Sequence, residues 1–144
     1  MLRYDSIAAT PAADYPFRNL IGSDVLPPEM EDEIARDFPQ IDKTGFMRPE
    51  DFAMGPAFKS LLAEVRGEAF ARAIGDKLGV DLVGKPSWVT VRKWSALKDG
   101  RPHTDGADKL ASALIYMKRD GTSGGNLRFL ESADQYGPGT AEDN

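Results

Sequence analysis

Hydrophobic and polar positions follow a helical spacing in the first half of the chain. Residues 26–38 begin with two prolines followed by a group of acids, which predicts a helix, because proline suits a first turn and acids complement the positive end of the helix dipole. Residues 56–78 carry an apolar stripe at helical spacing, and Gly79 stands where a left-handed cap is expected, which predicts one long helix. The stripe consists of Phe58, Leu61, Leu62, Val65, Ala69, Phe70, Ala73, Ile74 and Leu78.

The second half of the chain is richer in β-branched and aromatic residues. Residues 87–94, 110–117 and 126–130 each predict a strand, and residues 17–25 predict an earlier one that Gly22 interrupts. Helices that come first and strands that follow are typical of an α+β domain, in which the helices support an antiparallel sheet.

The composition favours one folded domain. The chain has 144 residues, 41% of them hydrophobic, which is enough to bury a core. We expect a single domain over residues 1–144: a mainly helical support region (1–84), the strands (85–130) and an acidic tail (131–144). There is no cysteine, which excludes zinc ribbons, iron–sulfur clusters, thiol catalysis and a disulfide scaffold.

The charge pattern disfavours some partners. The net charge is −5, so nucleic acid is not an expected partner. Residues 59–128 nevertheless hold 13 basic and 8 acidic side chains. This basic excess either forms a solvated face or attracts a small anion, such as a carboxylate, into a local pocket. No apolar run reaches the roughly 18 residues that span a bilayer, and the N-terminus lacks a secretory pattern, so we expect a cytoplasmic protein without a membrane partner.

The single histidine stands two residues before an aspartate, in His103-Thr104-Asp105. On extended backbone these two side chains point to the same face, so an imidazole nitrogen and a carboxylate oxygen can converge on one cation. Such donors suit Fe(II), Mn(II) or Zn(II), although two ligands do not make a tight site. The alternative is a turn histidine that is hydrogen-bonded to a nearby carboxylate.

The residues around this motif extend the pattern. A strand, the His103-Thr104-Asp105 motif, an apolar strand that ends in Ile115-Tyr116-Met117, and the segment Gly124-Gly125-Asn126-Leu127-Arg128-Phe129 follow one another. This order resembles the Fe(II)/2-oxoglutarate-dependent dioxygenases, in particular their prolyl 4-hydroxylase-like branch. The resemblance covers residues 87–130.

The resemblance implies a double-stranded β-helix, or jelly-roll, with N-terminal supporting helices. It implies that His103 and Asp105 are two of the three ligands of Fe(II), and that 2-oxoglutarate is the co-substrate, converted to succinate while a substrate C–H bond is hydroxylated. Tyr116 matches a position whose phenol can bind the distal carboxylate of 2-oxoglutarate, or it is an aromatic of the core or rim. The substrate, a small molecule or a peptide, cannot be read from the sequence.

The chain departs from this family where a second histidine ligand and a basic carboxylate clamp are expected, since it has one histidine and room for one further strand. We therefore expect an incomplete roll, with truncation of an oxygenase as the first explanation. The alternatives are a third ligand from Glu131, Asp134, Glu142 or another subunit, and a non-catalytic β-roll module that binds protein. Exposed strand edges would favour a homodimer. A cupin-like isomerase would need several more histidines.

Overall fold

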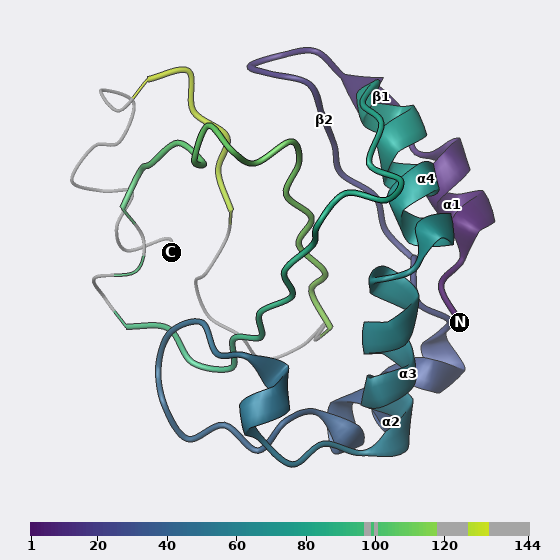
Figure 1. The fold of residues 1–144 in the computed structure, drawn as a ribbon, viewed down its shortest axis with the longest axis vertical. Coiled ribbons are helices and arrows are strands. Elements are labelled where there is room, and N and C mark those ends of the chain that lie inside the picture. Colours follow the sequence, from purple (N-terminus) through teal and green to yellow (C-terminus); the bar gives the residue numbers. More distant parts are fainter. Residues whose placement is uncertain (97–98, 100, 118–126, 133–144) are drawn as a thin grey trace.

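The helices of the chain gather along one side of the molecule, and the segments that follow them curve along the other side (Figure 1). The computed structural model describes residues 1–96, 99, 101–117 and 127–132. Its elements are α1 (Tyr4–Ala9), β1 (Ala12–Ala13), β2 (Asn19–Leu20), α2 (Pro28–Asp37), the short 3₁₀ helix η1 (Pro49–Asp51), α3 (Pro56–Val65) and α4 (Glu68–Leu78). The fold is therefore mixed α+β, as predicted.

Helix α2 confirms the helix expected over residues 26–38. Pro28 occupies the first turn, Glu29 and Glu31 lie near the positive end of the helix dipole, and Arg36 lies in the last turn. Ile34 is completely buried on the inward face of the helix, which packs against α3. The sequence signals for a helix start and an apolar face therefore agree with the structure.

The single helix expected over residues 56–78 is wrong, because the chain forms two helices there. The first ends at Val65, and Gly67 leaves helical geometry with φ −82° and ψ 160° before Glu68 begins α4. Glycine costs roughly 1 kcal/mol relative to alanine inside a helix, so a break is least unfavourable at this residue. Gly79 ends α4 in the left-handed conformation, with φ 74°, as expected.

The start of α3 is held by the end of α2. The backbone carbonyl of Asp37 accepts a hydrogen bond from the Gly55 amide at 2.9 Å, and its carboxylate accepts one from the Ala57 amide at 2.8 Å. The first amides of a helix have no partner within the helix, so an external carboxylate satisfies one of them. This contact fixes the angle between two helices that are adjacent in the core.

A hairpin and α1 are fastened to the C-terminal end of α4. β1 and β2 pair in antiparallel fashion, with Ala12 opposite Leu20. Arg18, in the turn of this hairpin, donates to the Lys77 carbonyl at 3.2 and 3.1 Å, and the Lys77 ammonium donates to the Ala8 carbonyl at 2.8 Å. Basic side chains near a helix C-terminus donate hydrogen bonds to the last carbonyls, which have no partner within the helix.

The core lies between the helices and the segment that contains Val91. The rings of Phe38 and Phe58 meet edge to face, with centroids 5.1 Å apart. Each fully buried aliphatic or aromatic side chain contributes about 1.5–3 kcal/mol through its removal from water. The buried cluster consists of Leu2, Leu26, Ile34, Ile41, Phe58, Leu61, Leu62 and Val91.

The structure does not show the expected jelly-roll. Among the described residues, the strands form one two-stranded sheet, and the strand expected over 17–25 is reduced to Asn19–Leu20. The segment 87–94 makes only isolated bridges, Met47 with Val91 and Thr44 with Trp94. Strand propensity becomes a sheet only where a partner backbone is aligned beside it, and over most of their length these segments have no such partner among the residues that the structure describes.

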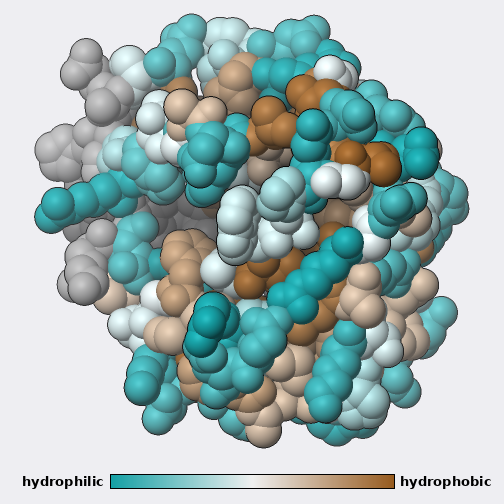
Figure 2. Space-filling view, in the orientation of Figure 1, coloured by the Kyte–Doolittle hydropathy of each residue, from teal (hydrophilic) through white to brown (hydrophobic). Residues whose placement is uncertain are grey.

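The segment 110–117 keeps the alternation of a strand although it is not paired in a sheet. Ile115 and Met117 pack against the core, whereas Leu114 and Tyr116 are 56% and 64% exposed. Polar side chains cover most of the face seen in Figure 2, and apolar patches lie between them. The strand expected over 126–130 is described from Leu127 on and has no strand geometry there, and most of the acidic tail lies outside the described residues.

Candidate functional site

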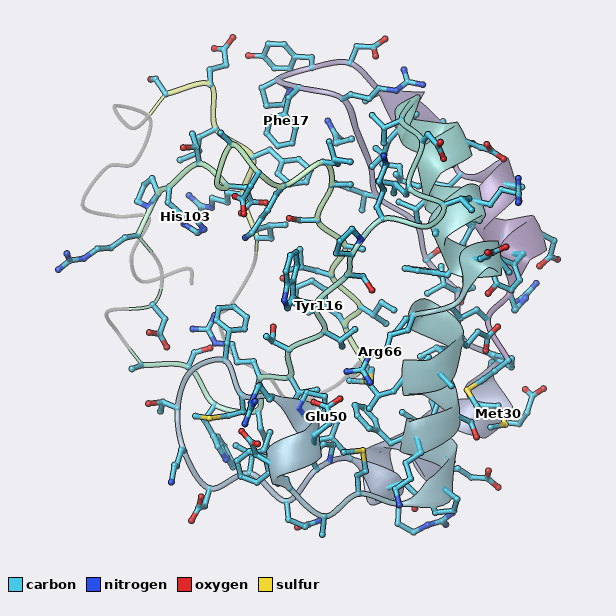
Figure 3. The ribbon with its side chains drawn as sticks, in the orientation of Figure 1. Phe17, Met30, Glu50, Arg66, His103 and Tyr116 are labelled. Atoms are coloured by element: carbon cyan, nitrogen blue, oxygen red, sulfur yellow. The ribbon has the colours of Figure 1, made fainter. Side chains whose placement is uncertain are left out.

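His103 lies on an irregular, exposed segment after the helical region (Figure 3). Its Nδ1 is 3.0 Å from the carbonyl oxygen of Arg101. Since a carbonyl oxygen can only accept a hydrogen bond, Nδ1 carries the proton of this contact. In a neutral imidazole the lone pair is then on Nε2, which is the state of a metal-binding histidine whose other nitrogen donates to a backbone carbonyl.

Asp105 is held by two side chains that the sequence analysis did not connect with it. The Ser112 hydroxyl donates to Oδ2, and the Lys109 ammonium donates to Oδ1 at 3.2 Å. These hydrogen bonds, first from Ser112 and then from Lys109, lower the pKa of the Asp105 carboxyl, and the charge of His103 acts in the same direction. Asp105 is therefore a carboxylate at neutral pH.

That His103 and Asp105 face one cation remains a prediction. The segment 101–106 contains no helix, so the backbone does not force the two side chains apart. This agrees with a shared site, and it agrees equally with the alternative of a solvent-facing turn.

Tyr116 lies apart from His103. Figure 3 shows Tyr116 between the irregular segments and α3, whereas His103 is on the side of the molecule away from the helices. Tyr116 is 64% exposed, on the face of residues 110–117 that points away from the core. The structure thus presents Tyr116 to solvent, and its role in binding 2-oxoglutarate remains a prediction.

The candidate third ligands are only partly described. Glu131 accepts a hydrogen bond from the Tyr15 hydroxyl, and this contact raises the pKa of Tyr15. Asp134 and Glu142 lie outside the described residues. Within the part of the chain that is described, no three histidine, aspartate or glutamate side chains form a group that could hold a metal ion.

The donor set nevertheless fits the first two positions of a metal site. Nε2 of a neutral His103 and the carboxylate of Asp105 would supply one nitrogen and one anionic oxygen, which are donors that suit Fe(II). A carboxylate oxygen that accepts one hydrogen bond retains a second acceptor position. The sequence made both residues candidates and gave no sign of Ser112. Only the i,i+4 spacing between Asp105 and Lys109 could have indicated a partner for the carboxylate.

A cluster next to the expected strand 87–94 has a structural role. Arg92 forms an ion pair with Asp99 at 2.6 Å and lies 4.7 Å above the ring of Phe46. The indole N–H of Trp94 donates to the Ile41 carbonyl at 3.1 Å. The contacts with Phe46 and Ile41 fasten residues 92–94 to residues 41–46, so Arg92 and Trp94 are part of the packing between the two halves of the chain.

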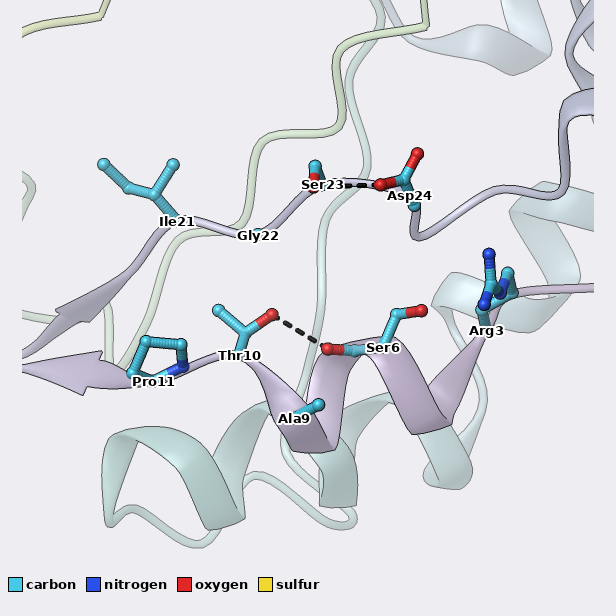
Figure 4. A pocket seen from close by; sticks show the side chains of 9 residues that line it. All are labelled: Arg3, Ser6, Ala9, Thr10, Pro11, Ile21, Gly22, Ser23 and Asp24. Carbon is cyan, nitrogen blue, oxygen red and sulfur yellow. Dashed lines mark hydrogen bonds between the residues drawn. The ribbon is translucent and has the colours of Figure 1, made fainter.

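An open pocket of about 390 Å³ lies between α1 and residues 21–24 (Figure 4). Thr10 donates to the Ser6 carbonyl at 2.8 Å on one side, and Ser23 donates to Asp24 at 3.1 Å on the other. The pocket is shallow and is not lined by His103, Asp105 or Tyr116. The lining residues are Arg3, Ser6, Ala9, Thr10, Pro11, Ile21, Gly22, Ser23 and Asp24.

Comparisons with known proteins find no relative of this chain. No family model, curated protein or solved structure matches this chain. In the part of the chain that is described, no helix is long and apolar enough to cross a membrane.

Proposed function

We propose that this chain carries the His-X-Asp part of an Fe(II)/2-oxoglutarate-dependent oxygenase of the hydroxylase type, acting on a small molecule or a peptide. One observation carries the proposal: Nδ1 of His103 donates to the Arg101 carbonyl, so in the neutral imidazole Nε2 is an electron-pair donor, two residues from the Asp105 carboxylate that Ser112 and Lys109 hold. The order of motifs over residues 87–130 supports it.

In this proposal, His103 through Nε2 and Asp105 through a carboxylate oxygen hold Fe(II). The bound metal, together with 2-oxoglutarate, supplies the activation of dioxygen that no side chain can provide. Tyr116 would bind the distal carboxylate of 2-oxoglutarate, which requires the phenol to be covered by further chain. The sequence has one histidine, so a second imidazole ligand would come from outside these 144 residues.

The fold that belongs to this proposal is a jelly-roll whose sheets are completed by additional strands. The alternation of core-facing Ile115 and Met117 with exposed Leu114 and Tyr116 supports it, because this is the pattern of a strand with one buried face. Additional strands would pair with this segment and cover its exposed face.

Anaerobic binding of Fe(II) to the purified chain tests the proposed ligands. His103→Ala and Asp105→Asn should each weaken binding by at least about tenfold, since metal affinity falls 10–100-fold even when outer partners of ligands are lost. Asp108→Asn is the matched control, because it removes a carboxylate from the same exposed segment and should leave the affinity unchanged. Equal Fe(II) affinity in all four proteins would show that the site is misassigned. Succinate release from 2-oxoglutarate, above a control without protein, would establish the activity.

A specific observation also favours the second candidate, a non-catalytic module that binds protein. The backbone of residues 110–117 forms no backbone hydrogen bond with any other residue that the structure describes. An extended segment with free amides and carbonyls can pair with a strand of another chain, including a second copy of this one.

Sedimentation velocity over a range of concentrations separates this candidate from a monomer. Leu114→Lys places a charge on the exposed face of the segment and should lower the dimer fraction, because lysine blocks strand pairing at an edge. Ile21→Lys, at a residue 78% exposed elsewhere on the surface, is the control. A chain that stays monomeric at all concentrations would exclude the homodimer.

A further inference from the structure

The pocket between α1 and residues 21–24 is held at both ends by backbone hydrogen bonds. At one end the Arg3 amide donates to the Val25 carbonyl at 2.9 Å. At the other end β1 pairs with β2, with Ala12 opposite Leu20. The two walls of the pocket lie between these contacts (Figure 4), so the backbone sets their spacing before any ligand binds. Ligand pockets are usually pre-formed in this way.

The lining of this pocket has a charged end and an apolar end. Figure 4 shows Arg3 and Asp24 at one end and Pro11 and Ile21 at the other. The charged end carries one cation and one anion, so it can bind a ligand that has both charges. Ile21 is 78% exposed, and an apolar group of the ligand would remove part of its side chain from water.

Arg3 can bind a carboxylate. Its contact with Asp5 is 3.9 Å long, and the two side chains are 44% and 77% exposed. This distance is too long for a hydrogen bond, and an exposed ion pair of this kind adds little stability. A guanidinium has five N–H donors in a planar fork and binds a carboxylate through two parallel hydrogen bonds. A ligand carboxylate would therefore bind Arg3 more strongly than Asp5 does.

Asp24 can bind an ammonium group. Its Oδ2 accepts a hydrogen bond from the Ser23 hydroxyl at 3.1 Å, and an ionised carboxylate accepts from several donors at once. Its backbone lies in the left-handed region, with φ 57°. Aspartate adopts this region more often than most residues, and residues held there cluster at ligand-binding sites.

We propose that this pocket binds a free α-amino acid with an aliphatic side chain. Its carboxylate pairs with Arg3 and its ammonium with Asp24. Its side chain lies against Pro11 and Ile21. A free amino acid carries both charges on one carbon atom, whereas a peptide separates them. The pocket volume of about 390 Å³ suits a small ligand. The inference is independent of the proposed function, since none of the proposed metal ligands lines this pocket.

A ¹H–¹⁵N NMR titration of the full chain with L-leucine tests the site. The amides of Ser6, Gly22 and Ser23 should shift, with a Kd of about 1–10 mM, because a small ligand in an open pocket binds weakly. Arg3→Met and Asp24→Asn each remove one charge and should raise the Kd about five- to tenfold, since each loses a charge-assisted hydrogen bond.

Two control variants remove the same charges elsewhere. Arg72→Met on α4 and Asp32→Asn on α2 change exposed positions outside the pocket and should leave the Kd for L-leucine unchanged. The same NMR spectra show whether each variant is folded. If Arg3→Met and Asp24→Asn bind L-leucine as tightly as these controls, the proposed site is wrong.

Ligand analogues test each charge without any change in the protein. Leucinamide lacks the carboxylate and 4-methylpentanoate lacks the ammonium, so each should bind the wild type about fivefold more weakly than L-leucine does. Arg3→Met should not weaken leucinamide further, and Asp24→Asn should not weaken 4-methylpentanoate further. Glycine, which has no side chain, should also bind more weakly than L-leucine. No shift at about 50 mM L-leucine, or analogues that bind as tightly as L-leucine, would overturn the proposal.

Discussion

The carboxylate of Asp37, the last residue of α2, accepts a hydrogen bond from the backbone amide of Ala57 in the first turn of α3, at 2.8 Å. The two residues are 20 positions apart. The irregular connection of residues 38–55 therefore begins and ends at one hydrogen-bonded junction, and α2 and α3 are placed against each other without a short turn between them.

Removal of this carboxylate should destabilise the fold. Asp37→Ala leaves the Ala57 amide without its acceptor, and the loss of a helix cap costs about 0.5–2 kcal/mol in the free energy of unfolding. Urea denaturation of the wild type and the variant measures the difference. Asp32→Ala, at an exposed position of the same helix, should stay within about 0.5 kcal/mol of the wild type. A variant Asp37→Ala as stable as that control would refute the cap.

Gly55 should tolerate no side chain while Asp37 is in place. A β-carbon at residue 55 would lie 2.2 Å from Cγ of Asp37, so Gly55→Ala must displace the carboxylate, at a cost of about 1–3 kcal/mol. In an Asp37→Ala background this clash is absent, and the same substitution should cost less. A double-mutant cycle from urea denaturation should therefore give a coupling of about 0.5–3 kcal/mol, and strict additivity would contradict the contact.

Phe58 should be the most sensitive of the core aromatics. It is 2% exposed and meets the ring of Phe38, so Phe58→Ala creates a cavity between α2 and α3 and should cost about 3–5 kcal/mol. Thermal denaturation followed by circular dichroism gives the measurement. Trp88→Ala is the matched control, since this larger ring is 80% exposed and its loss should change stability by less than about 0.5 kcal/mol.

The pair of Glu50 in η1 and Arg66 after α3 should respond to acid. The hydrogen bond from Arg66 is the main cause that lowers the pKa of Glu50 below its usual value. A pKa lowered by folding means that the stabilisation is present above the unfolded-state value and is lost as the pH falls through the folded-state value. Arg66→Met should raise the pKa of Glu50 in a carboxyl ¹³C NMR titration, whereas Arg72→Met, on exposed α4 surface, should not. An unchanged Glu50 titration in Arg66→Met would exclude the pair.

The helices were predictable where local signals decide the outcome. Pro28 and Ile34 identified α2 because a first-turn proline and a buried apolar face act within one helix. The break at Gly67 was missed because the apolar stripe runs through it without interruption. A glycine inside such a stripe is compatible with either one helix or two, and tertiary packing makes the choice.

The strands were predicted less well because a sheet depends on backbone partners far away in sequence. In the segment 110–117, Ile115 and Met117 face the core, yet no neighbouring strand among the described residues pairs with this segment. The spacing of His103 and Asp105 made them candidates, and their role as metal ligands remains a prediction. Ser112 could not be found in this way, since it lies seven positions after Asp105 on irregular backbone and no periodicity relates the two.

The buried cluster draws its members from Leu2 to Val91. A chain leaves the ribosome from its N-terminus, so these members have all been synthesised before His103. The helical part can thus collapse during translation, and the loop with the histidine and the aspartate is then added to a scaffold that already exists. Substitutions in that loop should consequently leave the yield of folded protein unchanged.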